Sequence, residues 1–282
     1  MAGPQDPLGY SSSYFAKLAD WQRFYLGFHG RFVDDCVLQL QNGAVEVRCA
    51  QAPSAKSTCK NAGGGLDKAA DPALTGTTVW DGAVVLAQYL TSTDELLDKT
   101  WRSKASRPTC IELGAGCAAV SLSLAACRRV SAVTITDLPD MVPHLQHNLQ
   151  RNANLLQDVP IKVAPLRWGK PDDVAALGPP KGPSKRRPTP HFDIIVGSDL
   201  VYYTNSEETP HSTLLLETLL MLASPGTLVF LSLSLHHNPE EVARFLKCAE
   251  ATFTVQHLHE QLPEQWRVPD VTVVKMVLRE KV

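Results

Sequence analysis

Short apolar stretches alternate with longer segments of helical spacing along most of the chain from residue 108 onward. The stretches predicted to be strands are 109–113, 132–136, 161–164, 192–197 and 228–233. Segments with helical spacing follow four of them, over 117–128, 140–152, 213–223 and 239–251. Strands that alternate with helices are typical of a parallel sheet covered on both faces, so the pattern predicts an open α/β domain.

The two ends of the chain depart from this alternation. Two apolar segments near the C-terminus, 252–258 and 271–278, have no helix between them, and we expect them to pair antiparallel. Near the N-terminus, 32–40 and 44–49 alternate partly around an Asn-Gly pair, which takes positive φ readily and predicts a β-hairpin. The apolar spacing over 80–97 predicts a buried helix.

Two stretches have the composition of connections. Residues 51–72 are rich in Ala, Ser, Lys and Gly, and 178–190 contain many prolines and a Lys-Arg-Arg run that predict a solvated loop. We therefore divide the chain into an N-terminal extension, 1–76, with the hairpin and a flexible loop, and one sheet domain, 77–282.

Composition and charge narrow the setting in which the protein works. The 282 residues are 44% hydrophobic with a formal net charge of -2, so nothing attracts the whole molecule to nucleic acid or to an anionic membrane. No stretch is apolar enough to cross a bilayer, and the first ten residues show no signal peptide. The seven cysteines form no C-x-x-C pair, as expected of reduced thiols in the cytoplasm or nucleus. Without a visible heptad or large apolar stripe, we expect a monomer.

The strongest local signal is the segment 111–119, Ile-Glu-Leu-Gly-Ala-Gly-Cys-Ala-Ala, in which a strand runs into a glycine turn and then a helix. Gly114, Ala115 and Gly116 form this turn, where glycine lets a ligand approach the backbone. The segment also matches the dinucleotide pattern G-x-G-x-x-G/A, and Asp137 ends the next strand, where a ribose-binding acid belongs. A tight turn without any ligand is the third interpretation.

Glu112 distinguishes between a dinucleotide and S-adenosylmethionine as the ligand of this turn. A dinucleotide brings a doubly anionic pyrophosphate to the turn, where a carboxylate is unfavourable, whereas S-adenosylmethionine brings an ammonium group. The negative charge of Glu112 therefore favours S-adenosylmethionine. Asp137 suits either nucleotide, because a carboxylate can accept hydrogen bonds from both ribose hydroxyls.

A second candidate site is the segment 192–203, in which an apolar strand ends in Ser198-Asp199 and Tyr202 and Tyr203 follow. Ligands of open α/β sheets bind beyond the carboxyl ends of the strands, so we expect Asp199 at the reaction site. The D-x-x-Y spacing can turn a carboxylate and a ring toward one cleft. The alternative is an Asp that caps the next turn and a Tyr that covers the sheet edge.

Five segments occur in a fixed order: TTVWDGAVVLAQYL, CIELGAGCAAVSLSLA, VTITDLPDMVPHLQHNL, APLRWG and FDIIVGSDLVYY. Together they resemble the seven-strand protein lysine methyltransferases known as methyltransferase family 16, over about residues 77–282. The resemblance implies a class I, Rossmann-like α/β fold: a seven-stranded, mostly parallel sheet with helices on both faces, its last two strands antiparallel, and an N-terminal hairpin. It also implies an enzyme that transfers a methyl group from S-adenosyl-L-methionine to a lysine of a non-histone protein.

By position, the resemblance assigns eight residues to the cofactor: Trp80, Glu112, Gly114, Ala115, Gly116, Asp137, Trp168 and Ser198. Glu112 and the glycine turn would hold the methionyl part, Asp137 the ribose and Trp168 the adenine. Ser198 would offer a backbone contact, and Trp80 would lie against the cofactor. Taken alone, the two tryptophans would be assigned to packing.

Asp199 and Tyr202 correspond to the D-x-x-Y motif of the family, where methyl donor and acceptor meet, and are the predicted catalytic residues. Methyl transfer from a sulfonium needs no metal, and we predict no metal site. A carboxylate attracts a lysine but also favours its unreactive ammonium form, so we expect Asp199 to orient the acceptor. Tyr202, with Tyr203, would line the acceptor channel by cation–π contact. A general-base role of Asp199 is the alternative.

Two positions depart from the family pattern, and other activities fit the same sheet. Ala118 stands where a third glycine is usual, and Ser198 where alanine is common. Ala118 cannot adopt positive φ cheaply, but it could begin the helix. Methylation of another protein side chain or of a small molecule is an alternative activity. An NAD-dependent oxidoreductase and a non-catalytic cofactor-binding module are more distant ones, opposed by Glu112 and by the intact D-x-x-Y motif respectively.

Overall fold

The computed structural model describes residues 35–51, 76–93, 107–178, 190–202, 210–235 and 238–279. Nearly all of the predicted flexible connection 51–72 and most of the predicted loop 178–190 lie outside these ranges. Within the described ranges, no helix is long and apolar enough to cross a membrane.

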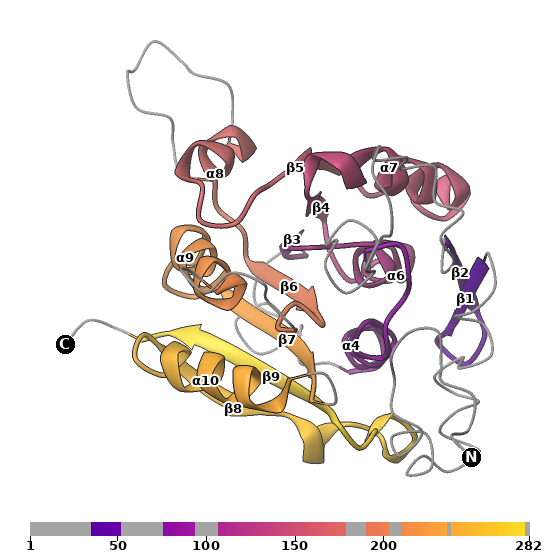
Figure 1. Ribbon diagram of the computed structural model, residues 1–282. Coiled ribbons are helices and arrows are strands. Elements are labelled where there is room, and N and C mark those ends of the chain that lie inside the picture. Colours follow the sequence, from indigo (N-terminus) through magenta and orange to yellow (C-terminus); the bar gives the residue numbers. More distant parts are fainter. Residues whose placement is uncertain are drawn as a thin grey trace, which may run out of the picture.

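A seven-stranded sheet forms the centre of the protein (Figure 1), with the strand order β5-β4-β3-β6-β7-β9-β8. β5, β4, β3, β6 and β7 pair in parallel, whereas β9 runs antiparallel to both of its neighbours, β7 and β8. This arrangement confirms the predicted α/β sheet and the antiparallel pairing of the last two strands. The strands are β3 (Thr109–Glu112), β4 (Ala132–Asp137), β5 (Ile161–Pro165), β6 (Ile194–Ser198), β7 (Leu228–Ser234), β8 (Phe253–His257) and β9 (Val271–Leu278).

Helices cover both faces of the sheet (Figure 1). The hydrophobic core on one face takes residues from α4, α6 and α7, and the core on the other face takes residues from α8, α9 and α10. The helices are α4 (Asp81–Ser92), α6 (Ala119–Ala126), α7 (Val142–Arg151), α8 (Pro171–Leu177), α9 (His211–Leu222) and α10 (Pro239–Ala249). Short 3-10 turns are η3 (Pro139–Met141), η4 (Ala153–Leu155), η5 (His259–Gln261) and η6 (Glu264–Trp266). The sequence pattern did not predict α8.

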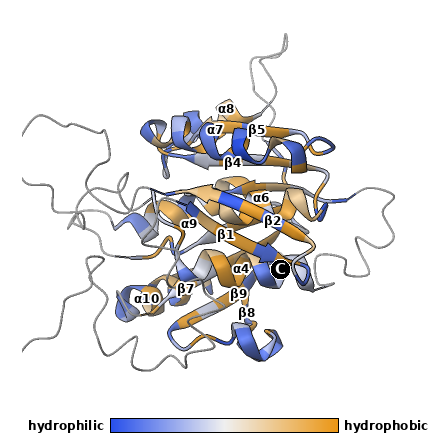
Figure 2. Cartoon of the chain, turned by 90° about the vertical axis from the view of Figure 1, so that its right-hand side faces the viewer, coloured by the Kyte–Doolittle hydropathy of each residue, from blue (hydrophilic) through white to orange (hydrophobic). Residues whose placement is uncertain are grey.

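The predicted β-hairpin is present. β1 (Asp35–Leu40) pairs antiparallel with β2 (Val45–Ala50), and Asn42 and Gly43 in the connecting turn both have positive φ. Figure 2 shows the hairpin in front of α4 and α6, whose ribbons carry mostly apolar colours. All eight residues of α6 and eleven of the twelve residues of α4 are buried. A helix that is apolar on every side is typical of such a core position, between the sheet and another layer.

Asn148 of α7 and Asn152, the C-cap residue of that helix, hold the edge of β2 that does not pair with β1. The Asn152 side chain accepts a hydrogen bond from the Arg48 N–H (3.0 Å) and donates to the Arg48 carbonyl (2.8 Å). Asn148 accepts from the Ala50 N–H (2.7 Å) and donates to the carbonyls of Ala50 and Cys117. Each amide imitates the backbone of a neighbouring strand, so the strand edge is satisfied. Asn148 also ties the hairpin to the residue that follows the glycine turn.

We expect Asn148→Ala to lower the free energy of unfolding by about 2–3 kcal/mol, because backbone groups of Ala50 and Cys117 lose their partners inside the protein. Gln150→Ala, at an exposed position of the same helix, should change it by less than about 0.5 kcal/mol. Urea unfolding of both variants measures the difference. Equal effects of the two substitutions would contradict the role assigned to Asn148.

Candidate active site

The carboxyl ends of β3, β4 and β6 meet where the strand order reverses, between β3 and β6 (Figure 1). Open α/β proteins bind their ligands at this position, because the loops after the two central strands leave in opposite directions. Glu112, Asp137 and Ser198 are the last residues of these three strands, and Asp199 follows directly. The predicted acidic residues therefore lie at the same edge of the sheet.

The glycine turn after β3 is bound to both neighbouring strands. The N–H of Leu113 donates to the carbonyl of Val196 in β6 (3.0 Å), and the N–H of Ala115 donates to the carbonyl of Thr136 in β4 (3.0 Å). The N–H of Gly116 donates to the carboxylate of Asp137 (2.7 Å). These bonds fix the path of the turn across the point where the strand order reverses.

Both glycines of the turn have positive φ and close neighbours. A Cβ on Gly114, at φ +53°, would lie 2.7 Å from Leu200 Cδ2 and 3.0 Å from Trp168 Cζ2. A Cβ on Gly116, at φ +55°, would lie 2.8 Å from the carbonyl oxygen of Gly76. Side chains at these positions would be strained and would displace their neighbours. The turn therefore requires glycine at both positions, and Trp168 lies beside it.

The sequence left open whether Ala118 adopts positive φ or begins the helix, and in the structure it does both. It is the N-cap residue of α6 and so begins the helix, yet it does so in the left-handed conformation, with φ 61°. That conformation costs an L-residue roughly 1–2 kcal/mol. The loop thus keeps the backbone shape that a third glycine would give, and the buried methyl group of Ala118 is retained in the core.

Glu112 points toward the first turn of α6. Its side chain is only 1% exposed, and one carboxylate oxygen accepts a hydrogen bond from the N–H of Ser121 (2.9 Å). Burial raises the pKa of Glu112 to about 7, and the nearby negative charge of Asp137 adds to this rise. The Ser121 N–H acts in the opposite direction, since it stabilises the carboxylate. Glu112 is therefore a buried acid that changes its charge near neutral pH.

Asp137 braces the glycine turn. Its two carboxylate oxygens accept hydrogen bonds from the N–H groups of Gly116 (2.7 Å) and Leu138 (2.7 Å). Burial raises the pKa of Asp137, and the two backbone bonds oppose that rise. Each carboxylate oxygen can accept more than one hydrogen bond, so hydroxyl groups of a ligand can still bind here.

Asp199 joins two sequence motifs that lie far apart in the chain. One carboxylate oxygen accepts a hydrogen bond from the N–H of Gly82 (2.8 Å), in the first turn of α4, and the other from the hydroxyl of Ser234 (2.5 Å). A Cβ on Gly82 would lie 2.5 Å from this carboxylate. The W-D-G segment and the D-x-x-Y segment therefore meet in one contact, in which Asp199 binds the first turn of an earlier helix, α4.

The remaining predicted site residues lie around these acids. Trp80 is the half-buried N-cap residue of α4. Ser198 is half-buried and lies opposite Ser232 of β7 in the parallel ladder. Tyr202 is half-buried and is the last described residue of its segment, whereas Tyr203 lies outside the described residues.

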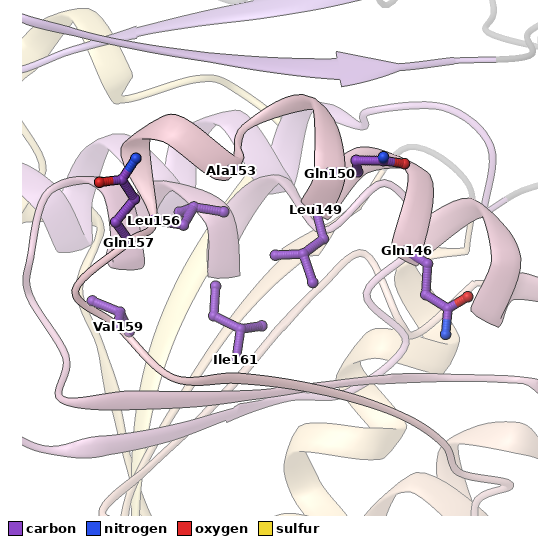
Figure 3. Close-up of a pocket in the computed structure, with 8 residues that line it drawn as sticks. All are labelled: Gln146, Leu149, Gln150, Ala153, Leu156, Gln157, Val159 and Ile161. Carbon is purple, nitrogen blue, oxygen red and sulfur yellow. The ribbon is translucent and has the colours of Figure 1, made fainter.

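A groove elsewhere on the protein does not belong to this site. It is open, has a volume of about 280 Å³ and lies between α7, η4 and β5 (Figure 3). Leu149, Leu156, Val159 and Ile161 contribute its apolar lining, and it contains none of the predicted site residues. In the part of the chain that the structure describes, no group of three or more His, Cys, Asp or Glu residues could hold a metal ion.

Comparison with protein families now identifies the chain. The model of a family described as lysine methyltransferase matches residues 70–251, a range that contains all the site residues above. The chain belongs to this lysine methyltransferase family. Membership agrees with the resemblance found in the sequence motifs and with the strand order of the sheet.

Individual members of the lysine methyltransferase family are identical to this chain at about a third of the aligned positions. Protein N-lysine methyltransferase METTL21A of Danio rerio is 33% identical over 181 residues, which are 64% of this chain and 70% of that protein. EEF1A lysine methyltransferase 3 of Xenopus tropicalis is 33% identical over 156 residues, 55% of each chain. A solved structure from Streptococcus mutans, described as a SAM-dependent methyltransferase, is 15% identical with a TM-score of 0.49, over 87% of this chain and 56% of that chain.

The structure adds residues that the motifs of this family did not single out in the sequence. The N–H of Gly82 donates to the carboxylate of Asp199. Ser232 and Ser234 lie on one face of β7, where Ser232 binds the carbonyl of Gly82 and Ser234 binds the carboxylate of Asp199. All seven residues of β7 are buried, so two serines at alternate positions in this apolar strand were a signal of a polar neighbour. The identity of that neighbour was not contained in the signal.

Replacing Glu112 by Gln should make the stability of the cofactor-free protein less dependent on pH. The folded-state pKa of Glu112 is about 7 against an ordinary value of 4.5, so the folded state binds more protons and stability falls as pH rises through this window. The stability advantage of Glu112→Gln over the wild type should therefore grow by about 2–3 kcal/mol between about pH 5 and about pH 8. Urea unfolding at the two pH values measures it, and a difference that stays constant would contradict the raised pKa.

Proposed function

We propose that the protein transfers a methyl group from S-adenosyl-L-methionine to a lysine side chain of a non-histone protein. One observation carries the proposal: two partly or fully buried carboxylates, Glu112 and Asp137, flank the glycine turn at the point where the strand order reverses. Such a site favours a cationic nucleoside over an anionic dinucleotide. Relatives in the same family are named for lysine methylation of proteins, one of them for EEF1A.

The residues around the turn fit the cofactor. Gly114 and Gly116 give the turn its positive-φ backbone, and Glu112 and Asp137 would offer acceptors for an ammonium group and for ribose hydroxyls. Trp168, which lies beside Gly114, would contact the adenine, while Trp80 and the backbone of Ser198 would contact the remaining parts. The bound cofactor supplies an electrophilic methyl group on a sulfonium, which an amine can take up in one in-line displacement.

Asp199 and Tyr202 would receive the acceptor. The carboxylate of Asp199, held by two donors, offers a fixed negative charge that attracts and orients a lysine side chain. The ring of Tyr202 would line the channel by cation–π contact. Loss of the lysine proton before attack is assisted by burial of the amine and by the neighbouring positive sulfur. Asp199 thus acts by orientation, while general-base catalysis is assigned to no residue of the chain.

The compartment and the oligomeric state of the enzyme are proposed as well. The six cysteines within the described residues are free thiols, five of them buried, which supports a reducing compartment such as the cytoplasm. We infer that the protein works there as a monomer on a protein substrate.

Radiolabelled S-adenosyl-L-methionine tests the function directly. The pure protein is incubated with the labelled cofactor and a proteome extract, and the labelled material is digested to amino acids. Label in methylated lysine supports the proposal. Label that resists protease, or label on another amino acid, would replace it by one of the alternative methyl acceptors. Calorimetric uptake of NAD with no uptake of S-adenosyl-L-methionine would overturn it.

Glu112→Gln should weaken binding of S-adenosyl-L-methionine by about tenfold or more, because a charge-assisted bond to the ammonium group is lost. Since this variant is expected to be at least as stable as the wild type at pH 8, weaker binding cannot be ascribed to unfolding. Isothermal titration calorimetry measures the affinity. Unchanged affinity would remove Glu112 from the binding site.

Asp199→Ala should abolish methyl transfer while the affinity for S-adenosyl-L-methionine stays within a few-fold of the wild-type value. The reason is that the carboxylate orients the acceptor and not the cofactor. Asp158→Ala, which removes a surface carboxylate that is 62% exposed, is the matched control and should leave both quantities unchanged. Simultaneous loss of transfer and of cofactor affinity in Asp199→Ala would refute this division of roles.

A further inference from the structure

Ser234 is the last residue of β7, the strand next to β6, and its side chain is turned toward the end of β6. Its hydroxyl donates to Oδ1 of Asp199 at 2.5 Å, and the residue is only 4% exposed. The serine hydroxyl is therefore held inside the protein against the carboxylate that the proposed function places at the acceptor. Nothing in the D-x-x-Y spacing predicts this contact, which spans 35 residues.

The backbone and a second donor hold Asp199 from other sides. Its own N–H donates to the carbonyl of Ser232 (2.9 Å), which fixes the residue at the end of β6 with φ 54°. Oδ2 accepts from the N–H of Gly82 (2.8 Å). Ser234 and Gly82 thus bind different oxygens of the carboxylate, so each of them contributes to the orientation of its plane.

The geometry points to Ser234 as a positioning residue of the methyl transfer reaction. Its hydroxyl fixes the direction in which Asp199 presents its negative charge to the incoming lysine. This inference rests on the proposed function. Without Ser234 the carboxylate loses the donor on Oδ1 and is oriented less firmly, so the acceptor is aligned less often for in-line attack.

Ser232 provides a matched comparison within the same strand. It lies two residues before Ser234 on the same face of β7 and is fully buried. Its hydroxyl donates to the carbonyl of Gly82 (2.8 Å), on the backbone of α4. Removing the Ser232 hydroxyl therefore disturbs α4, whereas removing the Ser234 hydroxyl disturbs the carboxylate.

The test compares Ser234→Ala, Ser234→Thr and Ser232→Ala in the full-length protein. Initial rates of label transfer from radiolabelled S-adenosyl-L-methionine are measured over a range of proteome extract concentrations. We expect the maximal rate of Ser234→Ala to fall about tenfold, with the affinity for S-adenosyl-L-methionine unchanged by calorimetry. Ser234→Thr keeps a hydroxyl and should restore most of the rate. Ser232→Ala should lower stability and reduce the rate less than Ser234→Ala does, because it removes neither donor to the carboxylate.

Equal rates of Ser234→Ala and Ser232→Ala, no rescue by Ser234→Thr, or a loss of cofactor affinity in Ser234→Ala would each overturn the role of Ser234.

A second readout does not depend on activity. Ser234→Ala should shift the urea midpoint in the wild-type background and shift it much less when combined with Asp199→Ala, because the contact is then already absent. Equal shifts in both backgrounds would refute the contact. A wild-type protein that labels no lysine refutes the proposed function instead, and leaves this coupling to be judged by the midpoints.

Discussion

Main-chain hydrogen bonds from the turn after β3 to the strands on either side are the constraint on which the site depends. Leu113 bonds to β6 and Ala115 bonds to β4, so the turn is shaped by the order of the strands and not only by its own glycines. The same order decides which side chains surround the turn. Asp137 comes from one neighbouring strand, and Asp199 follows the other.

The three acids of the site are held by backbone donors in the cofactor-free protein. Glu112 binds the first turn of α6, Asp137 binds the glycine turn and Asp199 binds the first turn of α4. These donors stabilise negative charge, while burial opposes it at Glu112 and Asp137 and raises the pKa of both. The side chains that the proposed function assigns to cationic ligands are thus fixed in the cofactor-free protein, which would reduce the conformational entropy lost on binding.

Local sequence patterns were sufficient to predict most strands and helices, because a buried parallel strand leaves a nearly continuous apolar run such as 228–233, interrupted only by Ser232. They missed α8, whose seven residues are too few to show a helical period. The glycine turn was predicted because its residues are adjacent. The partners of Asp199 were not, since Gly82 lies 117 residues before it and Ser234 lies 35 residues after it. The left-handed conformation of Ala118 was equally hidden, because an alanine at a helix start gives no sign of its φ.

The docking of the hairpin by Asn148 and Asn152 has a consequence for synthesis of the chain on the ribosome. The bonded backbone groups of β2 precede these asparagines by 98 and 104 residues. A hairpin translated first therefore carries an unpaired strand edge until α7 has emerged, and such an edge is a template for pairing with other chains. The first part of the described structure to be translated is in this way completed only when residues 98 and 104 positions further along have been made.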